Sequence, residues 1–131
     1  MRFCSIASGS SGNCIYVGSD NAHVLVDIGI SGKKMEAGLN SLELTGRDLD
    51  GILITHEHSD HIKGVGVIAR KYGIPIYATG GTVDAMLRTG SLGKLPEGIF
   101  REIKEDNPFM IKDLKINPFN IPHDAAQPVG Y

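Results

Sequence analysis

The segment from Asp50 to Gly64 constrains this chain more than any other part of its sequence. It opens with a short apolar run, Gly51–Ile54, which predicts a buried strand. Four side chains of metal-binding type follow that strand within six positions: His56, His58, Asp60 and His61. Such a concentration directly after a buried strand predicts a functional site there.

The spacing of these side chains predicts that they converge. Side chains alternate along an extended segment, so His56 and His58 point the same way. We expect Ser59 or Asp60 to cap a helix that starts near His61. This helix would turn the Asp60 carboxylate and the His61 imidazole back toward the same space. Imidazole and carboxylate together suit a divalent metal, with zinc expected and manganese or iron as alternatives.

The segment allows two other interpretations. One is that the histidines lie on the surface and Ser59 only caps a helix, but three histidines and an aspartate after one strand favour a metal. The other is the helical metalloprotease motif, which needs histidines at i and i+4. Here Asp60 stands four residues after His56, so that motif is absent.

Length and charge set broad limits on the protein. The 131 residues suffice for one ordinary domain, and 41% hydrophobic with 21% charged residues is typical of a globular protein. The net charge of −2 predicts no basic surface for nucleic acid, although metals can engage phosphate without one. We find no leader or long apolar run and expect a cytoplasmic protein with no membrane segment. In a reducing compartment, Cys4 and Cys14 are expected to stay free thiols.

Strands and helices are expected to alternate, which predicts parallel strands joined by helical crossovers in an α/β fold with a mixed sheet. The expected strands are Arg2–Ala7, Cys14–Val17, Ala22–Asp27, Gly51–Ile54, Ile74–Ala78, Ile99–Ile103 and Leu114–Ile121. The expected helices are Ser31–Leu42 with Ser31 as N-cap, His61–Tyr72 and Thr82–Arg88. Glu105–Asp113 is expected to form a turn or short hairpin, and His23 to be a structural or surface histidine.

The run Thr55-His56-x-His58-x-Asp60-His61-x-x-Gly64 resembles the signature of the metallo-β-lactamase superfamily of metal-dependent hydrolases. The opening Ala7–Asn13 and the segments Ile62–Gly64 and Ala69–Tyr72 are similar to a small bacterial subgroup, the YycJ/WalJ/VicX family. The resemblance implies that residues 1–131 are the N-terminal half of one αββα sandwich domain, with the C-terminal half absent. The sheet face left uncovered would then favour self-association.

The resemblance also implies a dinuclear centre with two divalent metals. His56, His58 and His123 would hold one metal. Asp60 and His61 would hold the other, with Asp60 also orienting or deprotonating the attacking water. Asp27 is expected to accept hydrogen bonds from the metal-binding loop rather than to bind a metal.

The loop Ser8–Asn13 allows two interpretations. Its composition fits a flexible hairpin turn, whereas its small residues would also let a phosphate approach closely. In the resembled superfamily this loop lies beside the metals, which makes Ser10, Ser11 and Asn13 candidate phosphate contacts.

The function implied for the full-length protein is hydrolysis of phosphodiesters, with DNA, RNA or a small phosphodiester as substrate. Alternatives are a thioester or lactam hydrolase of the same fold, or a fragment that only binds metal or a partner. His58 argues against a redox variant with iron, which carries glutamate at that position. The 131-residue chain alone is expected to be inactive.

Overall fold

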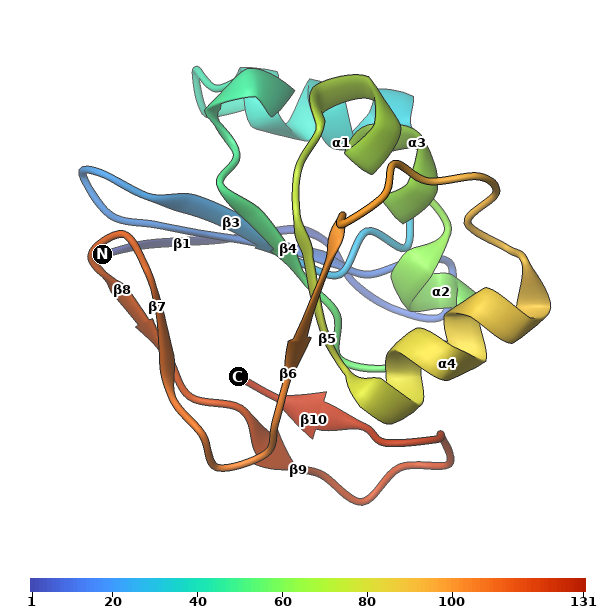
Figure 1. Cartoon of the computed structure of the whole chain (residues 1–131). Helices are drawn as coiled ribbons and strands as arrows, with labels where there is room; N and C mark the ends of the chain where they lie inside the picture. The colour runs from blue at the N-terminus through green and yellow to red at the C-terminus, as the bar shows by residue number, and fades with distance from the viewer.

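The computed structural model describes all residues from Met1 to Tyr131. Its centre is a six-stranded mixed sheet of order β1-β2-β3-β4-β5-β6 (Figure 1). The strands are β1 (Arg2–Ala7), β2 (Cys14–Gly18), β3 (His23–Val26), β4 (Gly51–Leu53), β5 (Ile76–Thr79) and β6 (Phe100–Ile103). The first three strands pair antiparallel, and β3 to β6 pair parallel. The expected α/β fold with a mixed sheet is confirmed.

Helical crossovers join the parallel strands, as parallel pairing requires. The helices are α1 (Gly32–Ser41), a 3₁₀ turn η1 (Gly46–Asp48), α2 (Ser59–Ile62), α3 (Val65–Tyr72) and α4 (Gly80–Thr89). The main core lies between the helices and one sheet face, where Leu25, Ile52 and Ile76 meet Met35 and Ile68, all fully buried. Burial of each such side chain stabilises the folded state by about 1.5–3 kcal/mol relative to leaving it exposed.

The opposite sheet face carries a second, smaller apolar cluster. Alternation along β3 and β4 turns Val24 and Leu53 to this side, where the hairpin β7 (Phe109–Ile111) and β8 (Leu114–Ile116) covers them. Beside the hairpin lies an apolar cavity of about 450 Å³. Phe3 at 70% exposure and Phe119 at 46% line this cavity, so this face carries exposed apolar surface.

The helix starts were predicted in part. Ser31 caps α1 as expected, since its side chain accepts a hydrogen bond from the backbone N–H of Lys34 at 3.3 Å. The expected capping of α2 by Ser59 or Asp60 is wrong: His58 is the N-cap residue and makes no side-chain capping bond. The backbone N–H of Asn13 donates to the Asp60 carbonyl at this turn.

The helix expected over 61–72 is two helices, α2 and α3, interrupted at Gly64. The Gly64 N–H bonds to the Ile28 carbonyl at 2.7 Å instead of continuing the helical ladder. A Cβ at Gly64 would lie 2.3 Å from the Ile30 carbonyl oxygen, so only glycine allows this approach. The backbone at Gly64 therefore packs directly against the segment that follows β3.

The C-terminal strands also differ from the expectation. The strand predicted over Leu114–Ile121 is divided into β8 and β9 (Phe119–Asn120), with Pro118, which has no N–H to donate, between them. The short strand β10 (Val129–Gly130) pairs antiparallel with β9. Cys4 and Cys14 are free, as expected. None of the helices has the length and apolar character needed to cross a membrane.

Candidate metal centre

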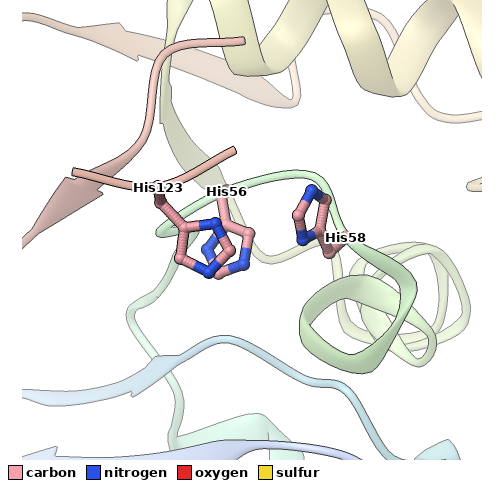
Figure 2. A group of neighbouring side chains, drawn as sticks. All are labelled: His56, His58 and His123. Atoms are coloured by element: carbon pink, nitrogen blue, oxygen red, sulfur yellow. The ribbon is translucent and has the colours of Figure 1, made fainter. Parts of the chain in front are cut away.

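Three imidazoles from two distant parts of the chain converge at one end of the sheet. His56 and His58 lie between β4 and α2, and His123 lies in the connection between β9 and β10. One ring nitrogen from each lies within 4.8 Å of the others, and Figure 2 shows the three rings gathered together. The structure thus brings together the three residues predicted for one metal.

His56 is the buried member of this group and has one ring nitrogen without a partner. Its Nδ1 lies 2.9 Å from the hydroxyl of Thr55, whereas its Nε2 is buried and makes no hydrogen bond. Burial, with the nearby charges of His61, His123 and His58, lowers the pKa of His56 to about 4. The ring is therefore neutral at pH 7. A buried nitrogen without a partner is costly, and a metal ion would satisfy it.

A chain of hydrogen bonds orients the His56 ring. The Thr55 hydroxyl donates to Oδ2 of Asp27 at 2.7 Å, because a carboxylate can only accept. That hydroxyl has no second proton, so it accepts from His56 Nδ1–H. The neutral His56 ring then carries its lone pair on Nε2, the atom without a partner, which is the form a metal ligand requires.

Asp27 also orients His61. Its Oδ2 lies 2.6 Å from His61 Nδ1, which must donate, and its Oδ1 accepts from the Thr55 backbone N–H at 2.8 Å. Burial lowers the pKa of His61, but the hydrogen bond to Asp27 and the charges of Asp27 and Asp60 outweigh burial and raise it. The carboxylate of Asp27 is thus committed to these donors, in agreement with the expectation that it accepts hydrogen bonds from this loop.

Asp60 and His61 lie beside the three-histidine group. Nε2 of His61, the ring nitrogen not used by Asp27, is 3.6 Å from Oδ2 of Asp60. The His61 ring centroid is 4.0 Å from that of His56. A carboxylate and an imidazole nitrogen therefore face a space adjoining the first group, where they could contribute to a second metal.

The glycine- and serine-rich loop reaches this centre through Asn13. The Asn13 backbone N–H donates to the Asp60 carbonyl at 2.8 Å, and its side-chain amide lies 3.4 Å from Oδ2 of Asp60 and 3.3 Å from His61 Nε2. A Cβ on Gly29 would lie 1.7 Å from the Asp60 carbonyl oxygen, so backbone packs on backbone here. Asn13 therefore stabilises the turn that carries Asp60 through its hydrogen bonds. Ser10 and Ser11 are exposed, and a phosphate-binding role for the loop stays a prediction.

Sequence reasoning missed some contributors to this site. Thr55 is part of the recognised motif, and a hydroxyl directly after a buried strand is a signal that could have identified it. Glu57 and Gln127, which hold the loop that carries His123, have no local signal in the sequence. His23 bonds to the hydroxyl of Tyr16 at 2.5 Å and takes no part in the group, as expected.

Together, the fold and the site define an α/β protein with a histidine-rich candidate metal centre where three parallel strands, β3, β4 and β5, end. The chain belongs to the metallo-beta-lactamase superfamily, whose family model matches residues 7–126. The expected family is thereby confirmed.

Two relatives match over the whole chain. It is 43% identical to exodeoxyribonuclease YycJ of Bacillus anthracis, over 100% of this chain and 49% of that protein. It is also 43% identical to exodeoxyribonuclease WalJ of Streptococcus pneumoniae, with the same coverage of both proteins. The chain therefore spans about half the length of these curated relatives.

Solved structures of the superfamily share the fold. The Rm3 metallo-beta-lactamase superposes with a TM-score of 0.78 over 97% of this chain and 51% of its own, at 21% sequence identity. The metallo-beta-lactamase SMB-1 in complex with mercaptoacetic acid superposes with a TM-score of 0.75 at 21% identity, over 92% of this chain and 51% of its own. At this identity the likeness concerns the fold alone.

Proposed function

We propose that this protein, at its full encoded length, is a metal-dependent phosphodiesterase that cleaves DNA or RNA. The observation that carries the proposal is the convergence of His56, His58 and His123 beside Asp60 and His61. The nucleic-acid substrate is supported by the names of the two 43%-identical relatives. The length of those relatives supports residues 1–131 as the N-terminal half of an αββα domain.

The residues present fit a divalent metal. His56 Nε2 is buried without a partner. Because His56 Nδ1 carries the proton and donates to Thr55, the lone pair of the ring is on Nε2. We propose that His56, His58 and His123 hold one metal and that Asp60 and His61 contribute to a second. Neutral imidazoles with a carboxylate favour zinc, with manganese or iron as alternatives.

Each group in the site would have a distinct task. A divalent metal, when bound, polarises phosphoryl oxygens and activates water as a nucleophile. Asp60, whose side chain is 35% exposed, can reach solvent and would orient the attacking water or accept its proton. Asp27 and Thr55 would hold the rings of His56 and His61 in place. Residues 1–131 offer only Asp60 and His61 to a second metal, so we propose that this chain alone binds metal without turnover.

The test is hydrolysis by the protein expressed at its full encoded length. Linear DNA, RNA and bis-p-nitrophenyl phosphate serve as substrates for the wild type, His58→Ala and Asp60→Ala. We expect each substitution to lower turnover by about 10²-fold or more. His23→Gln, a histidine substitution away from the site, should retain activity. Turnover that survives both site substitutions would contradict the proposal.

The same preparations separate the alternative chemistries. Hydrolysis of a chromogenic cephalosporin or of a glutathione thioester, with no cleavage of phosphodiesters, would favour the lactam or thioester interpretation.

We also propose a cytoplasmic location, supported by the two free thiols, and self-association of this chain through its exposed apolar sheet face.

A further inference from the structure

His123 lies on a connection that has little internal support. The strands that flank it, β9 and β10, pair through only two residue pairs. Within the connection, the backbone bonds run from the Ala125 N–H to the His123 carbonyl at 3.0 Å and from the Ile121 N–H to the Pro128 carbonyl at 3.5 Å. His123 itself is exposed. Contacts outside the connection must therefore hold its imidazole near His56 and His58.

Gln127 provides such contacts with the start of α4. Its side-chain Oε1 accepts from the backbone N–H of Gly81 at 2.9 Å. This N–H belongs to the first turn of α4, where backbone donors have no partner within the helix. The Gln127 carbonyl oxygen lies 2.8 Å from the hydroxyl of Thr79 and 3.2 Å from that of Thr82, and both threonines are fully buried.

The packing at this contact requires a residue without a side chain. A Cβ on Gly81 would lie 2.7 Å from the Cβ of Gln127 and 3.0 Å from its Oε1. On the other side of the connection, the Ala126 N–H donates to Oε2 of Glu57 at 2.9 Å. The connection is therefore attached at adjacent residues to α4 and to the segment that carries His56 and His58.

We propose that Gln127 is a positioning residue for the metal centre. By binding the first turn of α4 through its side-chain oxygen and its carbonyl, it fixes the connection so that His123 completes the three-histidine group. The proposal rests on the metal site proposed above and assigns to α4 a task in that site. Gln127 acts through the backbone and touches neither metal nor substrate.

The test measures the dissociation constant for zinc, by competition with a chromogenic chelator, in the metal-stripped protein at its full encoded length. Gln127→Ala removes the acceptor for the Gly81 N–H and should weaken zinc binding by about 10-fold, the lower end for groups that support ligands. Gln127→Glu keeps an oxygen at that position, facing the positively polarised start of a helix, and should restore the affinity. Gly81→Ala should weaken binding as Gln127→Ala does.

Circular dichroism and the melting temperature of the metal-free proteins establish that the variants fold. If Gln127→Ala does not fold, Thr82→Val tests the same contact, since it removes one hydroxyl from the Gln127 carbonyl and keeps the shape of the side chain. An unchanged zinc affinity in the folded variant overturns the proposal. So does an equal loss in Gln127→Glu, because the accepting oxygen would then have no role. If His123→Ala also binds zinc like the wild type, the metal site itself is wrong.

Discussion

At the scale of single residues, Asp27 and Thr55 connect the sheet to the candidate metal centre. Asp27 directly follows β3 and has a φ of 62°, a conformation that few residues other than glycine adopt. Its carboxylate accepts hydrogen bonds from the Thr55 backbone N–H, the Thr55 hydroxyl and Nδ1–H of His61. Two of the five candidate ligands, His56 and His61, thus take their ring orientation from one buried carboxylate and one hydroxyl.

The orienting role of Thr55 can be separated from its packing. Thr55→Val keeps the shape of the side chain but removes the hydroxyl that accepts from His56 Nδ1–H. We expect zinc affinity to fall by about 10-fold, because no acceptor then keeps the ring proton on Nδ1 and the lone pair on Nε2. Thr55→Ser retains the hydroxyl and should bind zinc like the wild type. Equal affinities in the valine and serine variants would show that the hydroxyl has no orienting role.

Cys14 should make stability depend on alkaline pH. Burial, with the charge of Asp27, raises the pKa of this thiol from 9.0 to about 12. Above pH 9 the unfolded chain loses the thiol proton while the folded protein keeps it. The stability difference between the wild type and Cys14→Ala should therefore be constant below pH 9. Above it the wild type should lose about 1.4 kcal/mol more per pH unit, up to about pH 12. Urea unfolding at several pH values measures this, and parallel curves for the two proteins would contradict it.

At the scale of elements, α3 is placed by glycines that permit backbone contact. A Cβ on Gly66, inside α3, would lie 2.2 Å from the carbonyl oxygen of Leu92 in the segment after α4. The Gly64 contact with Ile30, at the start of the same helix, is of the same kind. These approaches fix where α2 ends and α3 begins, and with them the position of the turn that carries Asp60 and His61.

Gly66→Ala tests this packing because helix propensity and packing predict opposite signs. In an exposed helix, alanine stabilises by about 1 kcal/mol relative to glycine. Here the clash is with backbone, which cannot rotate away, and overpacking costs about 1–3 kcal/mol. We expect a lower free energy of unfolding in urea titrations. Val67→Ala, at a half-exposed position of the same helix, should change it by no more than about 0.5 kcal/mol. A Gly66→Ala protein more stable than the wild type would disprove the close approach.

At the scale of the whole molecule, the two sheet faces differ in how they are covered. Helices bury one face in the main core, whereas the β7–β8 hairpin and Tyr131 cover part of the other. The remaining surface contains Phe3, Phe119 and the apolar cavity beside β8. An exposed apolar surface of this kind favours association.

The 131-residue chain should therefore self-associate through this face. Sedimentation velocity over a range of concentrations should show a shift from monomer to larger species. Phe3→Lys places a charge on the face and should shift the equilibrium to monomer, whereas Val67→Lys, on a half-exposed helix position, should not. A wild-type chain that stays monomeric at the highest concentration would contradict the prediction.

Much of this architecture could be predicted because its causes are local in the sequence. The apolar run at β4, the serine that caps α1 and the alternation of strands and helices each depend on a few neighbouring residues. His56, His58, Asp60 and His61 lie so close along the chain that the spacing itself keeps their side chains together. The resemblance to the superfamily added His123 and Asp27, which spacing alone does not connect to that segment.

The remaining features depend on contacts between residues far apart in the chain. The interruption of the helix at Gly64 depends on the Ile28 and Ile30 carbonyls, and the place of His123 depends on how Gln127 meets α4. The bonds from Asp27 to Thr55 and His61 exist only once β3 and β4 are paired. The sequence by itself determined that His56, His58, Asp60 and His61 form a group with metal-binding chemistry, since side-chain chemistry and spacing are local properties. Only the tertiary structure decided how they are oriented and held, because the partners that do so become neighbours on folding.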